Sequence, residues 1–215
     1  MSKPYSQSDF SRMITEDRTW RIKEISDLKA AILRADNILQ KVLLRAVATL
    51  CYAHWEGYVK FAAQKYMMHI ALRKYRYDEL HRQFRKNLFL PRLAALSRAK
   101  TSLNDRCALI DEILDSSDNR YSRVNDDLIA TKSNLNFEVF MDICLVCSVP
   151  IEDFNDESTF IDAILLKRRN DIAHGEDTFI DLADLTELTS RTISLMRNFG
   201  DALDNKASLK AYQVA

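Results

Sequence analysis

Hydrophobic residues recur along the chain at intervals of three and four positions, a spacing that predicts long helices with one buried face. A first stripe starts at Trp20 and ends near Asp36, with Ile25, Leu28, Ala31 and Ile32 between them. A second helix is expected to begin at Ile38 and to continue as far as Leu72. Its expected buried stripe consists of Ile38, Leu39, Val42, Ala46, Leu50, Ala53 and Gly57.

Proline and polar residues divide the middle of the chain. Pro91 is expected to start a helix, because proline fits the first helical turn. The polar stretch 116–127 is expected to form a loop. Ser133 or Asn134 then provides a cap for a helix that continues to about Cys147.

Two further helices are expected in the C-terminal part. Ser158 or Thr159 can cap the first of them, and Gly175 is expected to end it, since glycine is the usual residue just after a last helical turn. The final helix is expected to bury one face, which carries Leu182, Leu185, Thr189, Ile193, Met196 and Leu203.

Glycine and proline are scarce, and this composition sharpens the fold class. The 215 residues include three glycines and three prolines, about 3% of the chain against about 12% in an average protein. Sandwiches, barrels and hairpins need more of these residues for their tight turns. The sequence therefore predicts an all-α protein without a significant sheet, and we interpret residues 1–215 as a single domain.

Charges balance over the whole chain but are segregated along it. Residues 60–106 contain twelve basic and three acidic side chains, a net charge of +9, whereas residues 111–162 have a net charge of −10. Two such segments can attract each other within the fold, or the basic one can bind polyanions. The basic and acidic segments together suggest a variable insert at about residues 73–132.

Neither a membrane segment nor a metal site is expected. The N-terminal residues lack an apolar run, so we expect a cytoplasmic protein that does not bind membranes. Cys144 and Cys147 lie among hydrophobic residues and are interpreted as buried neighbours one helical turn apart, because no second pair completes a zinc site. The four histidines are scattered, and we expect no metal and no cofactor.

One short segment carries residues suited to acid–base chemistry on a phosphate. It reads Arg168-Arg169-Asn170-Asp171-Ile172-Ala173-His174-Gly175. An arginine presents a planar fork of donors to phosphate oxygens, and a histidine exchanges a proton near neutral pH. Cleavage of RNA without a metal requires both functions: proton transfer at the ribose 2′-hydroxyl or the leaving 5′-oxygen, and stabilisation of charge on the phosphate.

Helix geometry limits how the segment can act. On a continuous helix, Arg169 and His174 lie about 140° apart, whereas Asn170 and His174 share one face. A site that uses both Arg169 and His174 needs either a helix end at the histidine, which Gly175 would provide, or a second copy of the segment.

The segment Arg169-Asn170-x-x-x-His174 resembles the Arg-x4-6-His motif of the HEPN superfamily (higher eukaryotes and prokaryotes nucleotide-binding domains). The upstream run Tyr52-Ala53-His54-Trp55-Glu56-Gly57-Tyr58 is similar to the early core helix of one prokaryotic branch, whose later motif reads much like Arg-Asn-x-Ile-Ala-His-Gly. The resemblance covers mainly residues 40–60 and 155–200. It implies a bundle of long antiparallel helices and a homodimer in which two such motifs line one cleft.

Many proteins of this kind are metal-independent endoribonucleases that act as toxins or in abortive infection and other antiphage defence. By that resemblance His174 is the general acid or base, Arg169 binds and stabilises the phosphate, Asn170 orients either group, and Glu56 is a further acidic candidate that can instead serve only as an ion-pair partner. The alternative is a non-catalytic module that binds RNA, a nucleotide or a protein. A third possibility is a toxin silenced by an antitoxin or a nucleotidyltransferase.

Basic residues elsewhere are candidates for contacts with the RNA backbone, a mode of binding that tolerates many sequences. They are Arg168, Arg73, Lys74, Arg76, Arg82, Arg85 and Lys86. Lys65 is a further candidate for contact with the RNA backbone. Interleaved aromatic residues would stack on bases; these are Tyr66, Tyr75, Tyr77 and Phe84. The alternative is that this segment is simply a solvated face that pairs with the acidic segment.

Overall fold

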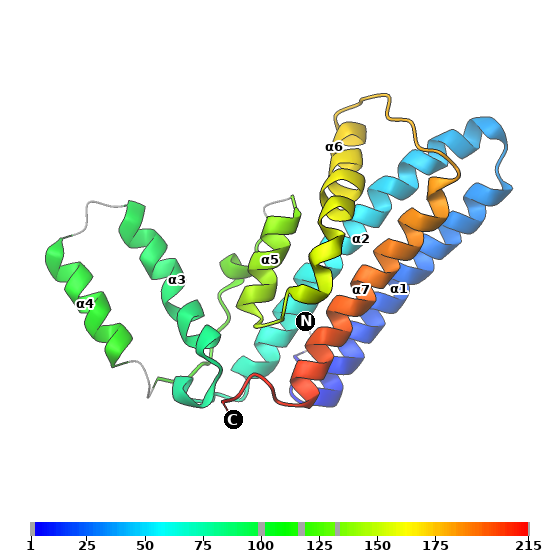
Figure 1. The fold of residues 1–215 in the computed structure, drawn as a ribbon. Coiled ribbons are helices and arrows are strands. Elements are labelled where there is room, and N and C mark those ends of the chain that lie inside the picture. Colours follow the sequence, from blue (N-terminus) through cyan, green and yellow to red (C-terminus); the bar gives the residue numbers. More distant parts are fainter. Residues whose placement is uncertain (1–2, 99–101, 116–118, 132–133, 215) are drawn as a thin grey trace.

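A computed structural model describes residues 3–98, 102–115, 119–131 and 134–214 as a set of helices without a strand in these ranges (Figure 1). Three long helices, α1 (Gln7–Arg34), α2 (Asn37–Ala71) and α7 (Asp184–Ser208), lie side by side as a bundle. The shorter elements are η1 (Tyr77–Glu79), α3 (Arg82–Arg98), α4 (Leu103–Leu114), η3 (Asp126–Ile129), α5 (Phe137–Val146), η4 (Glu152–Glu157), η5 (Phe160–Leu166) and α6 (Lys167–Ala173). The all-α prediction is confirmed.

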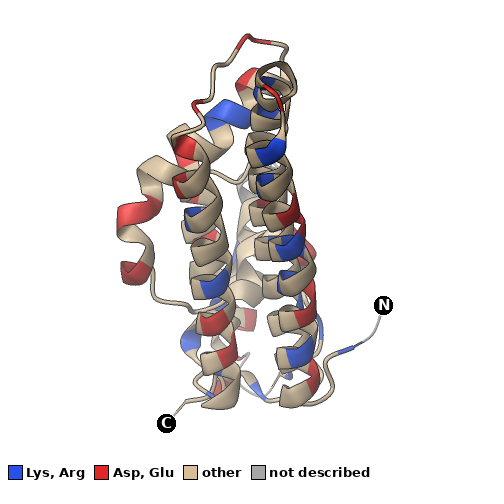
Figure 2. Cartoon of the chain, turned by 90° about the vertical axis from the view of Figure 1, so that its right-hand side faces the viewer, with Lys and Arg blue, Asp and Glu red and all other residues tan. Residues whose placement is uncertain are grey.

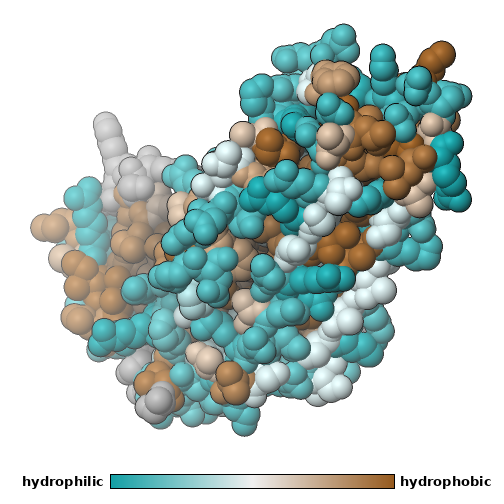
Figure 3. All heavy atoms as spheres, turned by 45° about the vertical axis from the view of Figure 1, so that its right-hand side comes forward, coloured by the Kyte–Doolittle hydropathy of each residue, from teal (hydrophilic) through white to brown (hydrophobic). Residues whose placement is uncertain are grey.

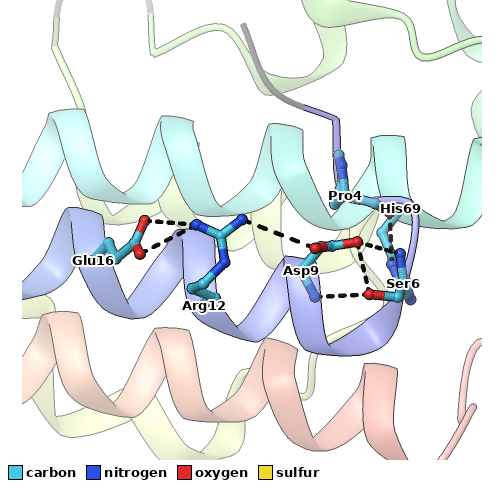
Figure 4. Close-up of polar contacts among 6 residues, drawn as sticks. All are labelled: Pro4, Ser6, Asp9, Arg12, Glu16 and His69. Atoms are coloured by element: carbon cyan, nitrogen blue, oxygen red, sulfur yellow. Dashed lines mark hydrogen bonds and ion pairs between the residues drawn. The ribbon is translucent and has the colours of Figure 1, made fainter.

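Side-chain caps fix the ends of the first two helices. The Ser6 hydroxyl accepts from the Asp9 amide, and the Asp9 carboxylate accepts from the Ser6 amide, so α1 starts well before Trp20 (Figure 4). The Asp36 carboxylate accepts from the amides of Ile38 and Leu39, which confirms the expected boundary there. Basic and acidic residues are interspersed along the helices of the bundle (Figure 2).

The helical period expected for α2 is confirmed, but its expected buried stripe is wrong. Ile38 is 83% exposed and Val42 is 60% exposed, and Ala46 and Ala53 are exposed too. The core instead receives the adjacent face, which carries Leu44, Val47, Ala48, Cys51, Tyr52, Trp55, Tyr58 and Val59. Because α1, α6 and α7 all pack on α2, they cover that face and leave the other open. We call Ile38, Val42, Ala46 and Ala53 the α2 outer stripe.

Close contact between α2 and α7 depends on a glycine. A Cβ added at Gly200 would lie 2.1 Å from the Tyr58 hydroxyl oxygen and 3.1 Å from the Arg18 Nη1 atom. The α7 face that turns inward contains Leu185, Thr189, Met196 and Leu203, as expected, whereas Leu182 is exposed and Ile193 is only half-buried. Glycine at position 200 therefore lets the Tyr58 ring pack against the α7 backbone.

The helix start expected at Pro91 does not occur, and a glycine inside α2 does not interrupt that helix. Pro91 lies inside α3, which continues to Arg98, so this proline does not start a helix and costs α3 one backbone hydrogen bond. Gly57 lies inside α2 without interrupting it, and a Cβ there would approach the Arg21 Nη1 atom to 2.7 Å. The glycine at this position makes room for a side chain of α1.

The middle region contains the smaller helices. An ion pair between Arg92 and Glu112 joins α3 to α4, so the basic and acidic segments do meet at this point. Asn136 caps α5 by accepting from the Val139 amide, two residues after Asn134; Ser133 lies outside the described residues. Cys144 and Cys147 are both buried, as expected. The assignment of residues 1–215 to one domain stays a prediction.

Candidate functional site

The segment with Arg169 and His174 lies at the C-terminal end of a helix whose first part is π-helical and whose second part is α-helical. Residues Phe160–Leu166 are π-helical, with the Lys167 amide donating to the carbonyl of Asp162, and α6 continues without a break to Ala173. The Gly175 amide then donates to the Ile172 carbonyl (3.1 Å) and the Glu176 amide to the Asp171 carbonyl (2.9 Å). Gly175 has φ +82°, so a Schellman motif ends the helix directly after His174, as expected.

Arg169 points from α6 to α2. Its Cζ atom lies 4.2 Å from the centroid of the Tyr52 ring, and its Nη2 atom lies 4.0 Å from the Glu56 Oε2 atom. Tyr52 and Glu56 are four residues apart and so share one face of α2. The side chains of Arg169 and Glu56 are only about one-fifth exposed. The structure thus brings together two of the predicted site residues, Arg169 and Glu56, and adds Tyr52.

Tyr52 is itself held in place. Its hydroxyl oxygen accepts a hydrogen bond of 2.6 Å from the Leu135 amide, and the residue is 1% exposed. Burial raises the pKa of the Tyr52 hydroxyl above its ordinary value, so the phenol stays protonated at neutral pH. A fixed, neutral aromatic ring therefore supports the Arg169 guanidinium by a cation–π contact.

His174 lies apart from this group. Its ring is exposed and makes no hydrogen bond or ion pair with any residue in the described part of the chain. Because α6 is regular up to Ala173, the wide angle between Arg169 and His174 is maintained within one chain. Asn170 is half-buried, and its carbonyl accepts the His174 amide at 2.9 Å. Within one chain, Arg169 and Glu56 therefore lie close together, but the His174 ring contacts neither of them.

Arg45 holds the loop that follows the motif. Its Nη2 atom donates to the Glu176 carbonyl (2.9 Å), and Nη1 donates to the Thr178 carbonyl (3.2 Å). This residue was not among those predicted from the sequence. Arg45, Tyr52 and Glu56 are separated by seven and four positions, so one face of α2 carries all three. The spacing of these three residues on one helical face could have identified Arg45 from the sequence.

The predicted RNA-contacting arginines and lysines lie elsewhere. Arg168 donates from Nη2 to an Asp184 carboxylate oxygen at 2.9 Å and so fastens α6 to the start of α7. The other basic residues come after the C-terminal end of α2, whereas Arg45 and the loop after the motif lie near its N-terminal end. At 1.5 Å per helical residue, Arg45 and Arg73 are separated by about 40 Å, so these basic residues lie far from the motif. Of this distant set, Lys74, Arg82, Arg85 and Lys86 are exposed, whereas Arg73 and Arg76 are half-buried.

The aromatic residues expected to stack on RNA bases do not form an exposed platform. Tyr66, Tyr77 and Phe84 are buried in the core, and Tyr75 is partly buried against it. Lys65 is also buried, with its Nζ atom 5.4 Å from the Phe61 ring centroid. The expectation of base stacking by the aromatic residues is therefore wrong, because these rings pack the end of the bundle, and burial of Lys65 likewise contradicts its expected contact with the RNA backbone.

Neither a metal cluster nor a membrane-spanning helix occurs among the described residues. Histidine, cysteine and carboxylate side chains do not gather there in a group of three that would hold a metal ion. No helix in this part of the chain is both long enough and apolar enough to cross a membrane.

The chain matches a known protein family. A family model described as RiboL-PSP-HEPN matches residues 16–205. Searches of curated proteins and of solved structures found no match. The matched range includes α2, with Tyr52 and Glu56, and the whole Arg169–His174 segment.

Proposed function

The chain belongs to the RiboL-PSP-HEPN family, and from this premise we propose that it is a metal-independent endoribonuclease. Membership confirms the resemblance to the HEPN superfamily, and it indicates a nuclease or an RNA-binding module. The observation that supports catalysis is the arrangement of Arg169, which lies over Tyr52 and beside Glu56 on the same helical segment as His174. We further propose that cleavage serves as a toxin or antiphage activity in the cytoplasm.

The proposed reaction is transesterification within the RNA. A base removes the proton of the ribose 2′-hydroxyl, the oxygen attacks phosphorus, and the bond from phosphorus to the 5′-oxygen breaks while an acid protonates that oxygen. His174 performs one of the two proton transfers, and Glu56 is the candidate for the other. Arg169 binds the phosphate and stabilises its developing negative charge, and Asn170 orients the reacting groups. The products are a 2′,3′-cyclic phosphate and a free 5′-hydroxyl.

A homodimer would complete this site. His174 does not contact Arg169 within one chain, and the apolar α2 outer stripe lies uncovered beside Glu56. Hydrophobic side chains also gather where α1 meets α2 (Figure 3); Leu33, Ile38, Leu39 and Val42 are all at least half exposed there. A second copy packed on this surface by two-fold symmetry would bring its motif opposite the first. We propose that the cleft takes Arg169 from one chain and His174 from the other.

Cleavage of RNA in EDTA tests the proposed activity. Purified protein is expected to cut tRNA or mRNA, whereas Arg169→Ala and His174→Ala are expected to lose activity. His81→Ala is a matched control, because this histidine is exposed and lies at the other end of the bundle, beyond α2. Equal cleavage by wild type and His174→Ala would refute catalysis by His174. RNA binding without cleavage in every preparation would favour the alternative, a non-catalytic RNA-binding module.

Mixing the two inactive variants tests the shared cleft. If the sites are composite, an Arg169→Ala chain and a His174→Ala chain assemble one intact site per mixed dimer. With random exchange of subunits the mixture should regain about a quarter of wild-type activity. Copurification of an untagged chain with a tagged one shows that subunits have exchanged. If the exchanged mixture is then as inactive as its components, the composite site is contradicted. We also propose an antitoxin or a nucleotidyltransferase as a partner of this chain. The identity of the neighbouring genes would test that proposal.

A further inference from the structure

A groove of about 730 Å³ lies between α3, α5 and η3. Figure 1 shows that α3 and α5 stand close at one end and diverge toward the other. The lining is mainly hydrophobic: Leu90 and Ala94 come from α3, Leu128 from η3, and Val139, Ile143 and Leu145 from α5. We propose that this groove binds an amphipathic helix of another protein that carries lysine or arginine along its flank.

Exposure of the groove supports binding by a partner. Leu90 is 39% exposed and Leu145 is 57% exposed, although both belong to helices that otherwise contribute to the core. On α4, Leu103, Ile110 and Leu114 are each more than half exposed as well. Figure 3 shows hydrophobic atoms gathered on this α3–α4 part of the surface. Contiguous apolar surface of this kind is typical of a helix-binding groove.

The charge of the groove lining indicates which kind of partner helix it binds. Asp127 and Asp142 line the groove, and neither carboxylate has an ion-pair partner among the residues that the structure describes. Two unpaired carboxylates on an apolar groove favour a ligand with hydrophobic residues on one face and basic residues at its edges. A second copy fits poorly, because α4, which is largely exposed, carries Asp105, Asp111 and Glu112 against Arg106.

Two synthetic helices test the groove directly. A fluorescein-labelled 14-residue amphipathic peptide of leucine and lysine, about 21 Å long as a helix, is compared with one in which glutamate replaces lysine. Fluorescence anisotropy should show at least about tenfold tighter binding of the leucine–lysine peptide. The double variant Asp127→Asn with Asp142→Asn should reduce that preference about fivefold or more. Equal binding of the two peptides would overturn the proposal.

Matched variants locate the bound peptide. Leu145→Lys should weaken binding of the leucine–lysine peptide about tenfold, because it places a cation on the rim of the groove. Val42→Lys makes the same kind of change on the α2 outer stripe; it should separate the proposed dimer but leave peptide binding by each chain unchanged. Circular dichroism and the melting temperature report whether each variant is folded. If Leu145→Lys binds like the wild type, or if it converts a dimer to a monomer by light scattering, the groove does not bind a partner helix as proposed.

Discussion

The Arg169 guanidinium lies over the face of the Tyr52 ring, with its Cζ atom 4.2 Å from the ring centroid. These residues are far apart in the sequence and come from α6 and α2. The ring is fixed by the hydrogen bond from the Leu135 amide to the Tyr52 hydroxyl, and Glu56 approaches the guanidinium from the next turn of α2. The direction of Arg169 is therefore set by two residues of α2.

Substitution of Tyr52 tests this arrangement. Tyr52→Leu removes the aromatic face and should lower cleavage by roughly 2- to 30-fold, since a cation–π contact contributes about 0.5–2 kcal/mol. Tyr52→Phe keeps the ring and should retain more activity, while the unpaired Leu135 amide lowers the free energy of unfolding by about 1 kcal/mol. Steady-state kinetics and urea unfolding separate the two effects. Identical kinetics for Tyr52→Leu and Tyr52→Phe would show that the ring does not position Arg169.

The α2 outer stripe gives a prediction about assembly. Val42→Glu places a charge on the uncovered surface and should convert the proposed dimer to a folded monomer without RNA cleavage. Because Val42 is 60% exposed in one chain, the substitution should leave the melting temperature of the monomer nearly unchanged. Light scattering gives the mass, and Leu145→Glu serves as a control outside the stripe. A wild type that is monomeric at micromolar concentration would contradict the proposed dimer.

Substitutions at Gly200 and Tyr58 should have non-additive effects on the free energy of unfolding. Gly200→Ala forces a Cβ against the Tyr58 hydroxyl and should lower the free energy of unfolding by about 1–3 kcal/mol through overpacking. Tyr58→Phe removes that oxygen, which has no hydrogen-bond partner among the described residues. The double variant should recover part of the loss, a non-additivity that urea unfolding of the four proteins measures. Strict additivity would mean that α7 does not press on the Tyr58 hydroxyl.

Gly175 should contribute through its backbone conformation. Its φ is +82°, and a Cβ added at this position would have no neighbouring atom within 4 Å, so Gly175→Ala meets conformational strain without a steric clash. It should cost about 1 kcal/mol of stability. Gly175→Asn is the matched control, because asparagine adopts this conformation more readily. A parallel cleavage assay asks whether this helix end also aims His174. Unchanged activity in both variants would show that the glycine only ends the helix.

Buried His69 should make stability depend on pH. Burial lowers its pKa to about 4, and the ring Nδ1 atom lies 3.2 Å from the Pro4 carbonyl oxygen (Figure 4). Between about pH 4 and pH 6.5 the unfolded chain binds more protons at this residue than the folded chain, so stability falls as the pH falls. From pH 7 to pH 5 the loss should be about 2 kcal/mol.

His69→Gln removes this proton uptake while keeping a donor for the Pro4 carbonyl. Urea unfolding at pH 5 and pH 7 should therefore show a smaller difference for His69→Gln than for the wild type. His174→Gln changes an exposed histidine and should keep the wild-type difference. If His69→Gln loses as much stability on acidification as the wild type, His69 is not the residue responsible.

The sequence by itself determined the helical fold class, two of the helix boundaries and the position of the motif. Scarce glycine and proline excluded a β fold, Asp36 marked the boundary between α1 and α2, and Gly175 marked the helix end after His174. These features depend on local backbone preferences, which neighbouring residues in the chain largely fix. The motif Arg169–His174 could be found for the same reason, since its spacing is a property of one segment.

Only the tertiary structure decided which faces are buried and which residues meet. Hydrophobic residues occur on more than one side of α2, so helical spacing alone predicted that Ile38 and Val42 would be buried. The packing of α1, α6 and α7 instead buries Trp55 and its neighbours. The contact of Arg169 with Tyr52 likewise requires α6 to lie against α2. Burial and long-range pairing depend on where other helices pack, which helical periodicity does not specify.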